Sequence, residues 1–312
     1  MPYNSLISRT DAAALIPQEV ANEIIAHVPQ QSAVMSLARR LPNMSRAQKR
    51  MPVMSALATA YFVSGDTSLK ETTEVNWENK YCYAKDLGVI VPIPKNVLND
   101  AAIPLWSEVQ PEVLTAIGVA VDNAMLYGTN KPSDWPDAII TGAAAASHNV
   151  SLAACDDLYD ALLDEDGVFS LVEQDGFGVT GSIAHLSMKG KLRGCRDAEG
   201  QPIFTKDPAV ADQYNIAGTR TEFPTSGVGS STYKLIAGDW SQLVYSIRQD
   251  MEFSVHTEGV ITDPAGNIVY NLMQQRMAAL MVTVRLGFAL PNPINRVQET
   301  EASRYPFAYL TA

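Results

Sequence analysis

The sequence predicts an α+β protein in which strands and helices form successive blocks instead of alternating regularly. Three observations carry this prediction: a long strand pattern over residues 50–88, one long helical pattern from Trp106 to Tyr127, and a return to strand patterns after Leu243. A doubly wound sheet would need strand and helix to alternate along the chain. At 312 residues the chain can bury a sizeable core without disulfides or metals.

The first forty residues are mostly polar and contain one amphipathic stretch. Pro17 suits a helix start, apolar residues follow at helical spacing up to Val28, and Pro29 ends the pattern. A short helix with one apolar stripe must bury that stripe on another surface. We therefore expect an N-terminal arm that needs a partner.

Residues 50–95 change to strand patterns. Residues 53–63 are β-rich towards their end, and aromatic and β-branched residues recur at even spacing from Val75 to Tyr83. The polar residues 64–74 between them contain a Gly-Asp turn dipeptide. This predicts an extended hairpin, which is marginal in water when isolated and must lie on its own domain or on a neighbouring chain.

Residues 89–94 predict a short buried strand ended by prolines, and the longest helix follows. Val113, Ile117 and Val121 form an apolar row at helical spacing, and Gly128 is a natural C-terminal stop. Pro111 is tolerated in the first turn of this helix and would otherwise kink it.

The second half of the chain predicts two further blocks. Residues 150–245 mix short helices and strands with many glycines, which indicates a compact α+β insertion. Residues 251–261 and 273–290 then predict strands on either side of a turn at residues 262–267.

Composition excludes several classes of protein. Hydrophobic residues make up 46% and charged residues 18%, as in an ordinary globular protein. The formal charge of −11 argues against a dedicated nucleic-acid-binding face. No uncharged apolar run reaches the roughly 18 residues of a membrane span, and no secretory signal is visible. Cys82, Cys155 and Cys195 lie far apart, which argues against a disulfide framework or structural zinc and fits synthesis in a reducing cytoplasm.

The sequence offers no convincing catalytic set, so we expect no enzyme, no cofactor and no metal. The four histidines form no i, i+4 pair, and neither HExxH nor GxSxG occurs. Gly176, Gly178 and Gly181 do match GxGxxG, after a plausible strand at residues 168–172. Three polar residues separate that strand from the first glycine, so loop glycines are favoured, and a nucleotide-binding oxidoreductase stays as an alternative.

A basic segment stands out against the acidic background. It contains five cations and no acidic residue: Arg39, Arg40, Arg46, Lys49 and Arg50. These cations could contact phosphates or acidic neighbours across an interface, and both interpretations stay open. Together with the arm and the unsupported hairpin, this segment is typical of an assembly subunit.

The order of these elements resembles the major capsid proteins of tailed bacteriophages, which have the Hong Kong 97-type fold. Residues 85–100 are similar to the family's strand and short acidic-ended helix, and residues 121–129 to the end of its spine helix, Asp-x-Ala-x-x-x-Gly. Residues 238–247 and 277–288 are similar to its return from the insertion and its late strand. The resemblance runs from about residue 10 to 297.

The resemblance implies a domain organisation. Residues 1–49 would be the N-terminal arm beneath a neighbour and residues 50–90 the extended loop across an adjacent subunit. Residues 91–149, with the spine helix, would begin the peripheral domain. Residues 150–244 would form the axial domain near the capsomer centre. Residues 245–312 would complete the peripheral domain and form a C-terminal tail.

The resemblance also implies contact sites. The loop tip would touch an adjacent subunit through Ser64, Gly65, Asp66, Leu69, Lys70 and Glu71. Capsomers would meet around threefold axes at Asp263, Pro264, Gly266 and Asn267. The basic segment would contact DNA or scaffold. Some relatives join subunits by a Lys–Asn bond, for which Lys70 is a conceivable donor; no acceptor is identifiable, and we expect no crosslink.

The function implied is a structural one. Hexamers and pentamers of the chain would form an icosahedral shell around double-stranded phage DNA, bound without sequence specificity. The other implied partners are a portal protein and scaffolding or decoration proteins, with no membrane. The arm begins within the first twenty residues, so any scaffold would be separate, absent or already cleaved. An encapsulin-type compartment is the nearest alternative.

Overall fold

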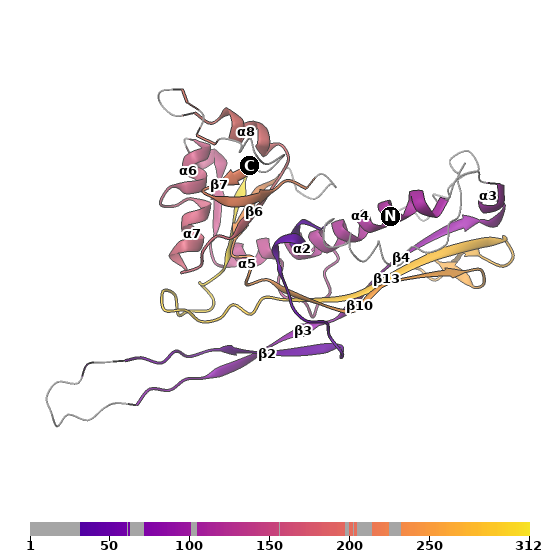
Figure 1. Ribbon diagram of the computed structural model, residues 1–312, viewed down its shortest axis with the longest axis horizontal. Helices are drawn as coiled ribbons and strands as arrows, with labels where there is room; N and C mark the ends of the chain where they lie inside the picture. The colour runs from indigo at the N-terminus through magenta and orange to yellow at the C-terminus, as the bar shows by residue number, and fades with distance from the viewer. Residues whose placement is uncertain are drawn as a thin grey trace.

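The computed structural model describes residues 32–60, 62, 72–100, 105–155, 157–196, 200–201, 203–204, 214–224 and 232–312. Figure 1 shows three parts: a long sheet with helix α4 along it, a second sheet with short helices at one end, and a two-stranded ribbon that projects away from both. Among these residues no helix, α4 included, is both long and apolar enough to cross a membrane.

The long sheet has four strands in the order β1-β10-β13-β4. Their bounds are Arg39–Arg40 (β1), Val244–His256 (β10), Met277–Ala289 (β13) and Lys85–Pro94 (β4). Strand β13 pairs antiparallel with both β10 and β4, and β1 runs parallel to β10. Short helix α3 (Lys95–Asp100) follows β4.

Strand β4 corrects the prediction of a short buried strand at residues 89–94. It begins four residues earlier, at Lys85, and its side chains alternate between half-buried and exposed over most of its length. Leu87, Val89 and Val91 pack on the core, whereas Asp86 and Ile90 face outwards. An edge position tolerates prolines because a ladder hydrogen bond is missing only on the outer side.

Helix α4 (Leu105–Tyr127) confirms the long predicted helix. Its buried row of Val113, Ile117 and Val121 belongs to one apolar cluster with the inward face of β13. Gly128, at φ +74°, takes the left-handed conformation that ends the helix. Pro111 lies inside the helix, beyond the first turn, and its carbonyl accepts the Thr115 hydroxyl at 3.0 Å.

The second sheet has six strands in the order β5-β14-β9-β6-β8-β7. Their bounds are Asn149–Ser151 (β5), Phe307–Thr311 (β14), Tyr233–Gly238 (β9), Gly181–Ala184 (β6), Thr219–Glu222 (β8) and Tyr214–Ile216 (β7). Around it lie α5 (Ile139–Ala145), α6 (Leu158–Leu163), α7 (Val168–Gln174), α8 (Met188–Gly194) and a 3-10 turn at Leu152–Ala154. This confirms the mixed α+β character predicted for residues 150–245.

Strand β14, at the end of the chain, lies between β5 and β9 in this sheet. The last residues therefore share a sheet with the segment that the sequence assigned to the axial domain. The predicted domain boundaries themselves stay a prediction.

The expected strand at residues 168–172 is wrong, because helix α7 covers them. Val168, Phe169 and Val172 lie on one buried helical face, and a short apolar run fits a helix as well as a strand. The glycines at 176, 178 and 181 lead from this helix into β6. Helix then strand is the reverse of the order in a dinucleotide fingerprint, so the oxidoreductase alternative loses its structural context.

The ribbon consists of β2 (Gln48–Met54) and β3 (Trp77–Tyr83), antiparallel in a register that runs from Gln48 opposite Tyr83 to Met54 opposite Trp77. This confirms the predicted hairpin. Its pairing as strands ends at Met54 instead of continuing to residue 63, although the Ser55 amide still bonds the Asn76 carbonyl at 2.9 Å. Residues from Lys85 onwards belong to the long sheet.

Candidate assembly interface

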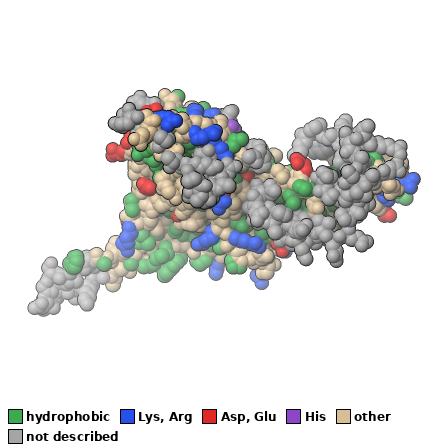
Figure 2. All heavy atoms as spheres, turned by 45° about the horizontal axis from the view of Figure 1, so that its top comes forward, with side chains coloured by type: hydrophobic (Ala, Val, Ile, Leu, Met, Phe, Trp, Pro, Cys, Tyr) green, Lys and Arg blue, Asp and Glu red, His purple; other side chains and the backbone are tan. Residues whose placement is uncertain are grey.

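The ribbon carries large apolar side chains that the described part of its own chain leaves exposed. Trp77 is 67% exposed, and Met54 and Tyr81 are also exposed, as is Phe62 on the chain beyond β2. The base is sheltered, because Cys82 joins a small buried cluster with residues of the segment before β2 and of the long sheet. Figure 2 shows the ribbon projecting beyond the body. Such a surface is typical of a segment that is covered by another molecule.

The predicted contacts at the loop tip lie outside the described residues. This applies to all six residues of that prediction: Ser64, Gly65, Asp66, Leu69, Lys70 and Glu71. Their role in contact with a neighbour stays a prediction.

The turn at residues 263–267 joins a small hairpin, β11 (Val260–Thr262) and β12 (Ile268–Asn271), at the far end of the long sheet. The predicted strand over 251–261 is thus split, since β10 ends at His256. The Asp263 carboxylate accepts the Asn267 backbone amide at 2.8 Å and its side-chain amide at 3.0 Å. These bonds lower the pKa of Asp263. Gly266, at φ +86°, supplies the left-handed residue of the turn.

This hairpin also exposes apolar side chains. Ile268 is 63% and Met273 is 77% exposed, and Val260 is exposed beside them. The hairpin therefore combines a turn held by its own hydrogen bonds with exposed apolar side chains, of which Ile268 lies next to the turn. Capsomer contact at Asp263, Pro264, Gly266 and Asn267 stays a prediction that this geometry suits.

The basic segment runs from β1 to the base of the ribbon and does not form one dense patch. Arg39 and Arg40 are exposed on β1, and Arg46 and Arg50 are exposed further along. The Lys49 ammonium donates to the Pro42 carbonyl at 2.8 Å. Because successive residues of a strand face opposite sides, Lys49 and Arg50 cannot serve one flat surface. In Figure 2 the Lys and Arg side chains are likewise spread over the face shown.

A buried carboxylate holds the first described residues to the spine helix. Asp122 of α4 is fully buried and accepts hydrogen bonds from the Ser32 hydroxyl, the Ala33 amide at 2.9 Å and the Val34 amide at 3.1 Å. These residues begin α2 (Ala33–Leu37), where the Ser32 hydroxyl also accepts the Met35 amide. Burial raises the pKa of Asp122 to about 6, against the opposing effect of its hydrogen bonds.

Asp122 is the aspartate of the motif Asp-x-Ala-x-x-x-Gly, to which the sequence assigns no role. A carboxylate directly after Val121, in the buried row of the helix, was the available signal. An unpaired charge there would be costly, so a partner was to be expected.

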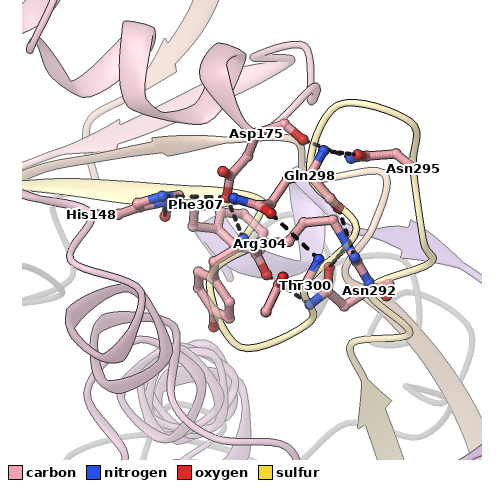
Figure 3. Close-up of polar contacts among 9 residues, drawn as sticks. His148, Asp175, Asn292, Asn295, Gln298, Thr300, Arg304 and Phe307 are labelled. Carbon is pink, nitrogen blue, oxygen red and sulfur yellow. Dashed lines mark hydrogen bonds and ion pairs between the residues drawn. The ribbon is translucent and has the colours of Figure 1, made fainter.

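A second buried polar cluster lies where α7, β14 and the segment before β14 meet (Figure 3). The Asp175 carboxylate accepts the Tyr305 amide at 2.7 Å and lies 3.3 Å from His148 Nε2. The other ring nitrogen of His148 lies 3.2 Å from the Phe307 carbonyl. The Asn295 side-chain amide donates to the Asp175 carbonyl at 2.6 Å. Sequence reasoning missed this cluster entirely.

Arg304 completes the cluster and is 3% exposed. Its guanidinium donates to the carbonyls of Gln298, Glu299 and Asn292 at 2.9, 3.0 and 3.0 Å. Burial lowers the pKa of Arg304, while the charges of Glu301 and Asp175 act in the opposite direction. The side chain therefore holds the loop before β14 from inside.

The remaining candidates for chemistry are dispersed. His185 and His256 each bond a serine hydroxyl two residues away, and His27 lies outside the described residues. Within the described part of the chain, no three His, Cys, Asp or Glu side chains gather as metal ligands would.

Comparison with known proteins identifies a common relationship. Residues 12–295 match the model of the phage capsid family. The major capsid protein of Staphylococcus phage 80alpha is 25% identical over 274 residues, which cover 86% of this chain and 79% of that protein. Among solved structures, a chain from Microbacterium phage Oxtober96 is 30% identical with a TM-score of 0.77, covering 98% of this chain and 99% of that one. A chain from Mycobacterium phage Bobi is 26% identical with a TM-score of 0.75, covering 98% and 99%.

Proposed function

Because the chain belongs to the phage capsid family, we propose that it forms hexamers and pentamers of an icosahedral shell that encloses double-stranded phage DNA. The chain is a major capsid protein, it has the fold of tailed-phage capsid proteins, and its place is the virion capsid. The encapsulin alternative finds no support, since the curated relatives are phage capsid proteins.

One observation carries the proposal: the ribbon has an uncovered apolar surface and projects from the body. Burying one large apolar side chain on a neighbour contributes about 1.5–3 kcal/mol. A subunit that gives its ribbon to one neighbour and receives a ribbon from another makes this contact twice. In a closed lattice such contacts act together, so weak individual interfaces suffice.

The other surfaces take supporting roles in this proposal. The β11–β12 hairpin would meet neighbouring capsomers through its exposed Ile268 and Met273. The basic segment would give local, sequence-independent contact with DNA phosphates or a scaffold. The net charge of −11 would keep the packed genome from binding the wall tightly everywhere. A portal protein, with scaffolding or decoration proteins, would complete the particle.

The predicted domains fit this scheme as part of the same proposal. The six-stranded sheet, with most of residues 150–244, would lie near the capsomer centre. The long sheet and α4 would form the peripheral domain. The chain would serve as a structural protein and not as an enzyme.

The test is electron microscopy of the purified full chain beside a variant that lacks residues 64–74. The unaltered chain should give uniform hollow particles or flat capsomers, whereas the variant should stay as small, folded species. A 33.8 kDa monomer that never associates would contradict the proposal. Intact shells of equal robustness from the shortened variant would remove the loop that connects β2 to β3 from the explanation.

A further inference from the structure

Residues 290–306, which connect β13 to β14, touch both the ribbon and the six-stranded sheet. These two parts otherwise have few contacts with each other. We call this segment the strap. In Figure 1 it lies at one end of the molecule, between the ribbon and the six-stranded sheet. Its contacts with the two parts differ in burial, and this difference indicates what the strap does.

The side of the strap that faces the six-stranded sheet is fixed by buried and part-buried contacts. The Tyr305 amide and the Asn295 side chain both bond Asp175, which directly follows α7. Arg304 bonds three carbonyls of the strap from within, so the loop keeps one shape (Figure 3). Removing one partner from such a network leaves buried polar groups unsatisfied, so this side should not open readily.

The side of the strap that faces the ribbon is held by separate, more exposed contacts. The Lys80 ammonium, on β3, bonds the Glu301 carboxylate at 2.8 Å, and Glu301 is 57% exposed. On the chain that continues beyond β2, the Ala58 carbonyl accepts a hydrogen bond from the Arg296 guanidinium at 2.8 Å. Burial is the largest single effect on the pKa of Lys80 and lowers it. Glu301 and Glu78 together outweigh burial and raise this pKa.

The space between strap and ribbon is polar and incompletely filled. A cavity of about 60 Å³ lies there, with Glu78, Lys80, Asn292 and Glu301 in its lining. This volume has room for water, and the lining has groups to bind it. This hydrated joint is closed by an ion pair, Lys80–Glu301, and a hydrogen bond to a carbonyl, Arg296–Ala58. It opens at little cost, because an ion pair near the surface contributes little and is screened by salt.

We propose that the strap is a releasable clasp that sets the angle at which the ribbon leaves the body. Its buried side stays with the six-stranded sheet, and its exposed side holds β3 through Lys80 and the chain beyond β2 through Ala58. Docking of the ribbon on a neighbouring copy is thereby coupled to the position of the six-stranded sheet. The coupling to docking rests on the proposed function, whereas the clasp itself is a property of the single subunit.

The test is hydrogen–deuterium exchange of the purified, unassembled full chain. Glu301→Lys should raise amide exchange in residues 48–58 and 76–83 roughly threefold, the size expected for loss of an exposed ion pair. The double variant Lys80→Glu with Glu301→Lys should restore the slower exchange. Glu258→Lys, an exposed change of the same charge far from the strap, is the control and should leave the ribbon unchanged.

Salt gives an independent readout, since about 1 M NaCl should abolish the difference between Glu301→Lys and the unaltered chain. Unchanged ribbon exchange in Glu301→Lys, or no rescue by the double variant, would overturn the clasp. Shell formation is scored separately by electron microscopy. A chain that loosens its ribbon as expected but never assembles would contradict the proposed function and leave the clasp intact.

Discussion

Two antiparallel strand pairs in this molecule look alike locally and differ in what covers them. The pair β10–β13 lies under helix α4 and contributes Val282 and Phe288, both 0% exposed, to the main core. The pair β2–β3 forms the ribbon and leaves Trp77 67% exposed. The first pair is therefore stabilised by burial within its own chain, whereas in the proposed shell the second pair would be buried on a neighbour. The same chain thus forms a body with a buried core and a ribbon whose apolar side chains remain exposed.

We expect the largest effect on stability from a substitution in the covered pair β10–β13. Phe288→Ala should lower the free energy of unfolding of the unassembled subunit by about 3–5 kcal/mol, because it removes a fully buried ring. That ring packs edge-on against Trp135, with 5.2 Å between ring centroids, and also contacts Tyr245. Chemical denaturation of the purified subunit measures the loss. A change below about 1 kcal/mol would mean that this sheet is not the stabilising core.

A smaller effect concerns the anchor between α2 and α4. The pKa of Asp122 is about 6, above its ordinary 3.8, so the folded subunit binds this proton more tightly than the unfolded chain. The contribution of Asp122 to stability is therefore greatest below pH 4 and declines as pH rises to 6, by about 2–3 kcal/mol in total.

Asp122→Asn cannot titrate, so its stability should lack this decline. The measurement is the difference between the unfolding free energies of the two proteins from pH 4 to 7, which cancels the other carboxylates. A difference that stays flat across this range would show that burial does not hold the carboxyl in its neutral form.

The sequence predicted the elements that carry a local pattern. Helix α4 was predictable because Val113, Ile117 and Val121 recur at helical spacing before Gly128. Helix α7 was predicted wrongly because an apolar run as short as residues 168–172 contains no period that separates helix from strand.

The two polar anchors are a different case, because their partners are distant in sequence. Ser32 lies 90 residues from Asp122, and Tyr305 lies 130 residues from Asp175. No spacing rule predicts contact between such residues, because the contact depends on how whole helices and strands pack together. The strap was unpredictable for the same reason. Its role depends on contacts with both the ribbon and the six-stranded sheet.

For the exposed pair β2–β3, we expect the smallest effect on folding and a large effect on assembly. Trp77→Asp should change the unfolding free energy of the unassembled subunit by no more than about 0.5 kcal/mol, because the ring is mostly exposed there. It should nevertheless suppress shell formation, because docking on a neighbour would bury the new charge. Asn79→Asp, on the same face of β3, is the matched control and should assemble more readily, because it removes no apolar surface.

Denaturation of the subunit and electron microscopy of the assembled material separate these two effects. If Trp77→Asp instead destabilised the subunit by several kcal/mol, the ribbon would be sheltered by its own chain, and the contrast between the two strand pairs would fail. If it assembled as well as Asn79→Asp, the apolar face of the ribbon would contribute nothing to the shell. Only an unchanged subunit that no longer assembles fits a ribbon whose burial occurs between copies.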